Sequence, residues 1–327
     1  MRFRTVMSCS KKKLEIFVLC RDRPRYTQEA IGSFKGQLRK NVELIISDNS
    51  TNSEVQKLIS SEFPEISYRR RLPPIPSANH VKKIIEESNG DYLVMFHDDD
   101  RVLPGYIDSL LSVIDEECDV SAIAPNGKFI GEQGNPLNFS NAMVSSGFSG
   151  GIRTLNAMDL VNAYYSPKSC GIPPFSGYVY NKKYLIKDLL QTSHGGKHAD
   201  VSLLVKLSKI KPILWLERVL VESRRHSLND SAQENLHDRL SLKKYLGNEG
   251  LLIRKTDAYN FFRFQYWFFW WLQNLGVKSL LRQDLGWRRK VVRKFILTKC
   301  IIYFFHYKKL REACLRRFAA SFQRGLS

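Results

Sequence analysis

Four short, strand-like runs alternate with amphipathic segments through the first 117 residues, and this order constrains the fold more than any other feature. Each run is mostly apolar, as expected of a buried strand, and each is followed by a segment with helical spacing. The runs are LEIFVLC, NVELIISD, ISYRRR and YLVMF, which begin at Leu14, Asn41, Ile66 and Tyr92. This β-α-β-α-β-α-β order predicts an α/β fold, with a mainly parallel sheet and helices on both faces.

The helices between these strands are expected over residues 27–38, 52–63, 77–90 and 104–117. Thr27 is expected to be the N-cap of the first helix, and Gly90 to end the third. Further along the chain, the sequence predicts a strand and a helix around 175–190, an amphipathic helix that opens at Asp200, and one or two strands around 212–224. From about residue 232 the chain is expected to be helical to its end.

Polar residues follow three of the predicted strands at the point where each strand ends. These clusters are Cys20–Arg23, Ser47–Ser50 and His97–Asp100. Because the carboxyl ends of parallel strands meet at one edge of a sheet, the three clusters are expected to lie side by side. Ligands of open α/β sheets bind beyond this same edge, which makes it the expected site.

Asp98, Asp99 and Asp100 are adjacent in a chain whose net charge is +19. Three neighbouring carboxylates repel one another, so a cation among them is expected. A hard divalent ion such as Mg²⁺ or Mn²⁺ prefers oxygen ligands and often bridges substrate phosphates. The alternative is a helix N-terminus, where aspartates cap the first turn and interact with the positive end of the helix dipole.

Six motifs, in their order along the chain, resemble those of family 2 glycosyltransferases with the GT-A fold. The motifs are FVLCRDRP, IISDNS, SANHVKKIIEESNGDYLVMFHDDD, PPFSGYVYNKKYL, HADVSLLVKL and RRHSLNDS. The resemblance implies a GT-A catalytic domain over residues 1–231 that binds a nucleotide-diphosphate sugar. It also implies an inverting transfer of the sugar that depends on Mn²⁺ or Mg²⁺.

The resemblance further implies which residues bind the nucleotide. Asp48 would hydrogen-bond the base, and Asn79 would hold the nucleotide or shape its pocket. Cys20, Arg21 and Asp22 would line the nucleotide from the loop after the first strand.

The same resemblance implies a metal site and a base. Asp98 would contact the ribose or the ion, and Asp99 falls at the usual metal-ligating position with Asp100 beside it. His226 would approach the diphosphate or the metal from the far side. Asp200 would be the catalytic base that receives the proton of the acceptor hydroxyl.

The chain departs from the family pattern at three places. Residues 20–22 are Cys-Arg-Asp where the family commonly has Thr-Tyr-Asn. His97 replaces the first acid of the D-x-D-D form, so the division of roles among the three aspartates stays open. Ala199 replaces the usual Glu before the base, which leaves Asp200 as the carboxylate there and His198 as the next candidate.

Three of the assigned residues also have a simpler structural explanation. Asp48 would fit a turn of the Asx type, and Asp200 would fit a helix cap. His226 follows Arg224 and Arg225 and would fit a solvated loop histidine.

The last quarter of the chain carries most of the positive charge. Residues 251–327 hold 17 Lys and Arg against 3 Asp and Glu, whereas residues 1–250 hold 34 against 29. Ten of the thirteen residues 259–271 are aromatic, and a basic amphipathic pattern follows them. These patterns predict that the C-terminal helical region, residues 232–327, binds an anionic membrane surface. The alternative is that the aromatic side chains pack on the catalytic domain or on a second subunit, so an oligomer is also compatible with the sequence.

The six cysteines are scattered without a CxxC pair, which indicates a reduced, cytoplasmic setting. No apolar run approaches the roughly 18–20 residues that span a bilayer. The expected location is therefore peripheral, at the cytoplasmic face of a membrane. The expected function is sugar transfer to a glycan or lipid-linked acceptor in bacterial surface-polysaccharide assembly.

Two other classes of function remain as alternatives. One is a catalytically inactive protein that binds nucleotide sugars. The other is a basic nucleic-acid-binding protein, since basic charge with interleaved aromatic residues is typical of that class. The chain has no nucleic-acid motif, and the strand-end carboxylates would repel phosphates, so no nucleic-acid partner is expected.

Removal of the residues beyond about 255 should release the protein from anionic vesicles. High salt should weaken the binding of the full chain, because it screens attraction between basic side chains and lipid headgroups. Cosedimentation with vesicles that contain an anionic lipid measures both effects. A full chain that ignores the vesicles, with a truncated chain that aggregates, would identify the region as core or subunit interface.

Overall fold

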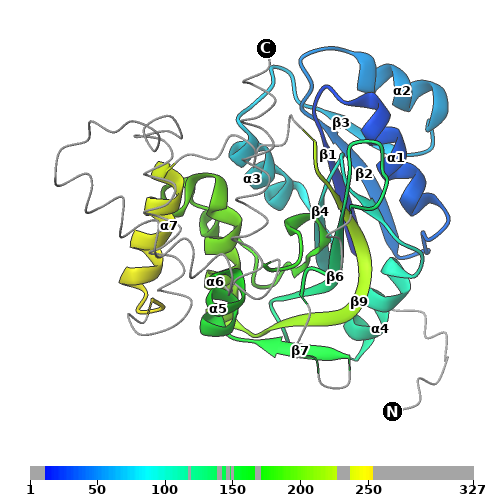
Figure 1. The fold of residues 1–327 in the computed structure, drawn as a ribbon. Coiled ribbons are helices and arrows are strands. Elements are labelled where there is room, and N and C mark those ends of the chain that lie inside the picture. The colour runs from blue at the N-terminus through cyan, green and yellow to red at the C-terminus, as the bar shows by residue number, and fades with distance from the viewer. Residues whose placement is uncertain are drawn as a thin grey trace, which may run out of the picture.

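The computed structural model describes residues 12–116, 119–137, 142–144, 148, 151–165, 171–226 and 236–252. Within these residues, nine strands form one sheet, flanked by helices (Figure 1). The strands are β1 (Leu14–Cys20), β2 (Val42–Asp48), β3 (Ser67–Arg70), β4 (Tyr92–His97), β5 (Arg101–Val102), β6 (Ala122–Ile130), β7 (Ile152–Leu155), β8 (Val179–Asn181) and β9 (Ile213–Arg224). The α-helices are α1 (Pro24–Lys35), α2 (Glu54–Glu62), α3 (Ser77–Glu87), α4 (Tyr106–Asp115), α5 (Ala157–Tyr165), α6 (Ala199–Ile210) and α7 (Leu236–Asn248).

The four predicted parallel strands lie together in one half of the sheet. The strand order is β3-β2-β1-β4-β8-β6-β9-β5, with β7 beside β9. β3, β2, β1 and β4 are parallel to one another, as are β6 and β9, whereas β5, β7 and β8 run antiparallel to their neighbours. The predicted α/β fold is confirmed, and its sheet is mixed, although most strands have a parallel neighbour.

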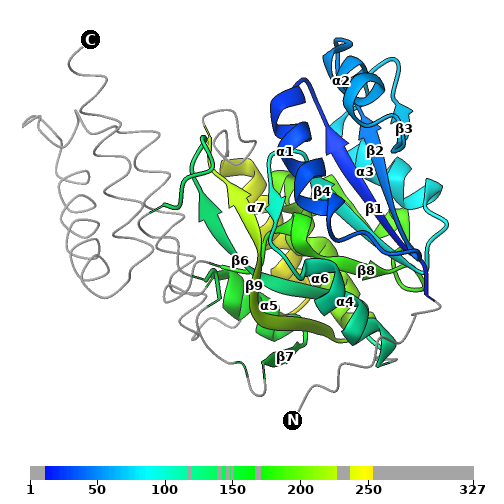
Figure 2. The same cartoon turned by 90° about the vertical axis from the view of Figure 1, so that its right-hand side faces the viewer.

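Two hydrophobic layers cover the sheet, which explains why β1 is apolar apart from Glu15 near its start. Ile16 and Val18 pack with α1, α2 and α4, whereas Phe17 packs with α3, α5 and α6. Figure 1 shows these two groups of helices on opposite sides of the sheet, and in Figure 2 the side with α1 and α4 faces the viewer. Because side chains alternate between the faces of a strand, a strand covered on both faces is apolar throughout.

Two predicted helix boundaries are wrong. α1 begins at Pro24 rather than after Thr27, because the fixed backbone angle of proline suits the first helical position. Thr27 lies inside the helix, where its hydroxyl donates to the carbonyl four residues earlier at 3.0 Å. α3 ends at Glu87, before Gly90. Gly90 permits close packing instead, since a Cβ there would lie 2.9 Å from the carbonyl oxygen of Tyr92.

Four elements, β5, β6, β7 and α5, are not predicted by the sequence pattern. β6 contains Pro125 and Gly127, which are uncommon inside strands. Its pairing with β9 shifts register on either side of Asn126, and this irregularity accommodates the two residues. Between β8 and α6, where the sequence predicts a helix, the chain forms only three 3₁₀ turns. These are η2 (Lys187–Leu189), η3 (Thr192–His194) and η4 (Gly196–His198).

α7, which lies at the start of the predicted C-terminal region, packs against the α/β fold. Leu246 is buried in one cluster with Val161 of α5 and Val201 of α6. The predicted boundary after residue 231 falls outside the described residues, as do the aromatic residues 259–271, so the membrane-associating region stays a prediction. In the part of the chain that the structure describes, none of the helices has the length and apolar character needed to cross a membrane.

Leu246→Ala should lower the free energy of unfolding by about 2–5 kcal/mol, because it opens a cavity in a fully buried cluster. Leu240→Ala on the same helix is the matched control. Its side chain is 36% exposed, and its loss should cost less than about 1 kcal/mol. Denaturant unfolding of both variants measures the difference. Equal effects would mean that α7 is not part of the folded core.

Candidate active site

The carboxyl ends of β1, β2 and β4 lie side by side, as the sequence predicts. Cys20 pairs with Asp48 on one side of β1, and Leu19 pairs with His97 on the other. The contact continues beyond the strands, because the amide of Asn49 donates to the carbonyl of Cys20 at 2.9 Å. The three predicted polar clusters therefore meet at one edge of the sheet.

The cation among the aspartates is Arg23, which the sequence pattern does not single out. Its Nη2 lies 2.5 Å from Oδ1 of Asp98, and its Nη1 lies 3.0 Å from Oδ2 of Asp99. The backbone amide of Arg21 also donates to Asp98, at 3.0 Å. Asp98 is fully buried, so these donors satisfy a carboxylate that water does not reach.

Asp100 is held by segments from the other half of the sheet. The backbone amide of Arg224, the last residue of β9, donates to its Oδ1 at 2.8 Å. The hydroxyl of Ser176 donates to its Oδ2. Ser176 lies in the 3₁₀ turn η1 (Phe175–Gly177), so the PPFSG motif reaches the aspartates.

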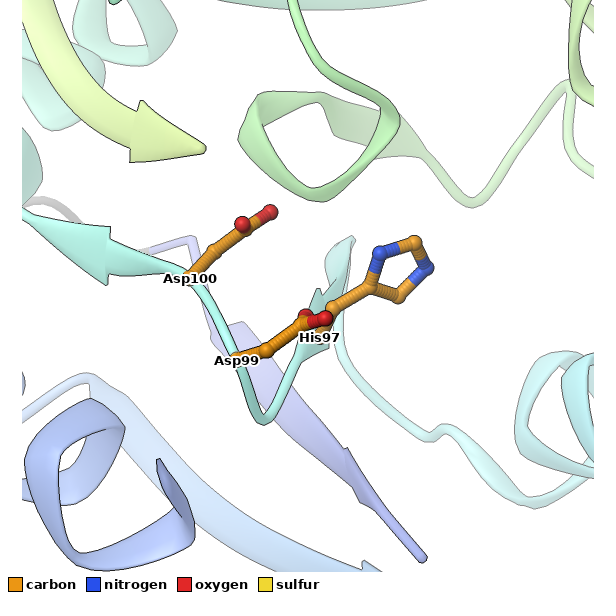
Figure 3. Close-up of side chains that lie close together, drawn as sticks. All are labelled: His97, Asp99 and Asp100. Atoms are coloured by element: carbon orange, nitrogen blue, oxygen red, sulfur yellow. The ribbon is translucent and has the colours of Figure 1, made fainter. Parts of the chain in front are cut away.

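Asp99, Asp100 and His97 bring three potential ligand atoms within 4.8 Å of one another (Figure 3). His97 ends β4, and its ring stacks on that of Phe175 with the ring centroids 5.7 Å apart. Carboxylates suit Mg²⁺ and Mn²⁺, and an imidazole favours a transition metal. The residues present therefore fit a divalent ion with mixed oxygen and nitrogen ligands.

His226, the third predicted metal ligand, lies beside this group. Its Nε2 is 2.9 Å from Oδ2 of Asp99 and 3.4 Å from Nη1 of Arg23. The predicted proximity of His226 to the acidic motif is therefore present in the fold, although residues 227–230 of its loop lie outside the described residues. Its role toward a metal or a diphosphate stays a prediction.

The surroundings give the three aspartates different proton affinities. Burial raises the pKa of Asp98, and the guanidinium of Arg23 opposes this rise. Burial also acts to raise the pKa of Asp99, but His97, Arg23 and His226 outweigh it and lower that pKa. Burial and the neighbouring Asp99 raise the pKa of Asp100 to about 6. Asp99 is therefore the aspartate that its surroundings hold most firmly in the anionic form.

Asp48 and Asp22, two of the aspartates predicted to bind the nucleotide, have protein partners of their own. Asp48 is fully buried, and it accepts the hydroxyl of Tyr68 at 2.6 Å and the amide of Ser50 at 2.9 Å. The second bond is the local contact of an Asx turn. Asp22 accepts the amide of Thr51 at 2.8 Å and so ties the loop after β1 to the loop after β2. Their roles toward a nucleotide stay predictions.

The other three predicted nucleotide contacts differ in exposure. Cys20 is buried in the core, where burial raises the pKa of its thiol well above the usual range, and its role toward a nucleotide stays a prediction. Arg21 and Asn79 are exposed, at the end of β1 and in the first turn of α3. Next to Asn79, the buried His80 places its Nε2 2.7 Å from the hydroxyl of Ser47.

Asp200 lies in the first turn of α6, on the face of the sheet opposite to α1. The N-cap of α6 is His198, so Asp200 is not the cap. Burial raises the pKa of Asp200, while His198 and His97 oppose the rise. His97 also opposes the rise in the pKa of Asp100. His97 therefore lies within electrostatic range of both Asp200 and the acidic cluster.

Arg23, Phe175 and Ser176 complete the site. They lie in the motifs FVLCRDRP and PPFSGYVYNKKYL, but the sequence pattern does not single them out as site residues. Arg23 immediately precedes Pro24, so the start of α1 fixes its backbone next to the strand ends. Ser176 meets Asp100 across 76 positions of the sequence. Such contacts depend on how the strands are ordered, and local periodicity carries no information about them.

The affinity of the full chain for Mn²⁺ should fall as the pH is lowered from about 8 to about 5. An ion binds the carboxylate and not the acid, so below a pKa of about 6 it must displace a proton from Asp100. Titration calorimetry at both pH values measures this. Asp100→Asn should bind Mn²⁺ weakly and lose the part of the pH dependence that Asp100 contributes, whereas the exposed Asp108→Asn should keep the affinity and pH dependence of the wild type. An Asp100→Asn variant with unchanged affinity would remove Asp100 from the ligand set.

No curated protein shows a significant match to the sequence. The crystal structure of S. aureus TarS 1–349 in complex with UDP-GlcNAc is similar with a TM-score of 0.52 and 11% identity, covering 78% of this chain and 80% of that one. TarS 1–349 in complex with UDP gives a TM-score of 0.49 and 13% identity, covering 75% and 73%. At 11% identity the first match shows a shared fold alone, an α/β fold of the GT-A kind.

The sequence itself identifies the family. Residues 15–170 match the family model described as Glycosyl transferase family 2. The matched span begins in β1 and contains the strand ends and all three aspartates, and it stops before η1, α6 and β9. The chain therefore carries a glycosyl transferase family 2 domain over residues 15–170.

Proposed function

We propose that the chain transfers a sugar from a UDP-sugar to an acceptor hydroxyl, with a divalent ion at His97, Asp99 and Asp100. The observation that carries this proposal is the meeting of these three side chains at the end of β4, inside the family 2 domain. UDP-GlcNAc in the similar TarS structure supports a uridine donor. Mn²⁺ matches the mixed ligand set better than Mg²⁺, because an imidazole is among the ligands.

The ion would neutralise the negative charge that develops on the diphosphate leaving group as the sugar bond breaks. Asp99 is the best-suited anionic ligand, because its surroundings lower its pKa. His226, 2.9 Å from Asp99, would hold that carboxylate in place or join the ligands when the donor binds. Arg21 is exposed at the same edge and would pair with the diphosphate.

Residues at the strand ends would make the remaining contacts with the nucleotide-sugar donor. Asp48 and Asn79 would contact the nucleoside, with Asp22 shaping the loops around it. Asp98 is fully buried and paired with Arg23, so we assign it to holding the loop rather than to the ribose. Cys20 contributes to the core below this edge.

Asp200 would act as the base. Its pKa is raised by burial, so its carboxylate is a stronger proton acceptor than an ordinary aspartate. The acceptor oxygen would attack the anomeric carbon from the face opposite the diphosphate, and its proton would pass to Asp200. A single displacement of this kind inverts the anomeric configuration.

The acceptor we propose is a glycan or lipid-linked glycan of a bacterial surface polysaccharide, at the cytoplasmic face of a membrane. The support is the concentration of basic and aromatic residues after residue 250, which suits an anionic membrane surface. The second candidate is a protein that binds the nucleotide sugar without transferring it. A measurement of turnover distinguishes this protein from a transferase.

A panel of UDP-sugars tests the proposed function. The full chain should release UDP from one or more of them in the presence of Mn²⁺, slowly with water and faster with an acceptor glycan. Chelation of the metal should abolish the release, as should Asp99→Asn, which removes charge but little volume. Binding of a UDP-sugar without any release of UDP would favour the inactive alternative, and full activity after chelation would contradict the metal site.

Asp200→Asn should reduce kcat by about 10²–10⁴-fold with nearly unchanged donor affinity, because asparagine cannot accept the proton. Asp159→Asn is a matched control, since Asp159 also lies in the first turn of a helix, α5. It should leave kcat unchanged. Donor Kd and kcat on the two variants separate a base from a residue that stabilises a helix start. Near-normal turnover of Asp200→Asn would move the base to His198.

A further inference from the structure

The guanidinium of Arg23 occupies the charged centre of the site. It forks onto Asp98, with Nη2 2.5 Å from Oδ1 and Nε 3.4 Å from Oδ2. Its remaining nitrogen, Nη1, lies 3.0 Å from Oδ2 of Asp99. The guanidinium of Arg23 is thus paired with two carboxylates. Asp98 is fully buried, and Asp99 is 7% exposed.

The same guanidinium stands next to the atoms that would hold a divalent ion. Asp99 belongs to the group of three ligands with His97 and Asp100. Its Oδ2 is already shared by Arg23 and His226. A divalent ion bound by these three residues would therefore lie close to the guanidinium of Arg23, which already pairs with one of its ligands, Asp99. The two cations repel each other, because the buried carboxylates around them leave less water to screen the charges than at an open surface.

A donor changes this balance. A nucleoside diphosphate brings negative charge to the edge of the sheet where Arg23 lies. The side chain of Arg23 is 28% exposed, so a bound diphosphate has access to it. Arginine pairs with phosphate oxygens as readily as with carboxylates. The diphosphate offers the guanidinium another partner and offsets the repulsion between the two cations.

We propose that Arg23 is a positioning residue that makes the binding of the divalent ion depend on the nucleoside diphosphate. Without the nucleotide, Arg23 holds Asp98 and Asp99 and opposes the ion. With the nucleotide, both cations face the diphosphate, and the ion binds tightly. This inference rests on the proposed function, since it requires the ion and the donor to share the site.

The test is the affinity of the full chain for Mn²⁺, measured from the electron paramagnetic resonance of free Mn²⁺, with and without UDP. UDP should tighten Mn²⁺ binding of the wild type by at least about 10-fold, a typical size for coupling between two ligands. Arg23→Gln should bind Mn²⁺ about 10-fold more tightly than the wild type when UDP is absent. The enhancement by UDP should shrink accordingly in this variant.

Two further variants control the experiment. Arg39→Gln removes an equal charge from an exposed pair with Asp108, before the amino end of β2, and should behave as the wild type. Arg23→Gln leaves Asp98 buried without its cation, which destabilises a fold. The double variant Arg23→Gln, Asp98→Asn removes both charges together and keeps all three metal ligands. It should show the same tighter binding of Mn²⁺ without UDP.

The outcomes separate the inference from the proposed function. A purely structural Arg23 would predict weaker Mn²⁺ binding in Arg23→Gln, which is opposite in sign to our expectation. Unchanged or weaker binding without UDP, in the single and the double variant, would overturn the inference while leaving a UDP-dependent metal site intact. A wild type that binds no Mn²⁺ even with UDP would instead overturn the metal-dependent function itself, and the inference with it.

Discussion

Charge compensation around the three aspartates after β4 is the constraint on which the rest of the site depends. Asp98 and Asp100 are almost without contact with water, and a buried carboxylate is costly unless it is paired. Arg23 supplies the cation from the loop after β1, and the backbone of Arg224 supplies a donor from the end of β9. The acidic motif is therefore compatible with the fold only when both halves of the sheet are assembled around it.

The shared environment also divides the work among neighbouring residues. Asp98 accepts hydrogen bonds from the guanidinium of Arg23 and from the backbone amide of Arg21, in the loop after β1. Asp99 lies beside Arg23, His97 and His226, which lower its pKa and hold it in its anionic form. Asp100 has a raised pKa and hydrogen bonds from Ser176 and Arg224. Identical side chains at consecutive positions thus acquire different chemistry from the segments that surround each of them.

The two halves of the sheet contribute different parts of the proposed reaction. The parallel half, β3-β2-β1-β4, ends in the polar clusters that suit a nucleotide donor. The other half brings η1, α6 and the end of β9, and with them Ser176, Asp200 and His226. α7 packs on α5 and α6, so the beginning of the C-terminal region supports α6, the helix that carries Asp200. The family 2 match covers the donor half and stops before these contributions.

The amino-acid sequence alone predicts the four parallel strands, the helices between them, the meeting of their polar ends and the resemblance to family 2 glycosyltransferases. These features follow from hydrophobic periodicity and from motifs that are local in the chain. Only the folded structure reveals the antiparallel pairing of β5, β7 and β8, the placement of β6 with its Pro125 and Gly127, and the position of Arg23 among the aspartates. Arg23 and Asp98 are 75 positions apart, and Ser176 and Asp100 are 76 apart. Their contacts exist because strand order brings distant segments together, which no local pattern encodes.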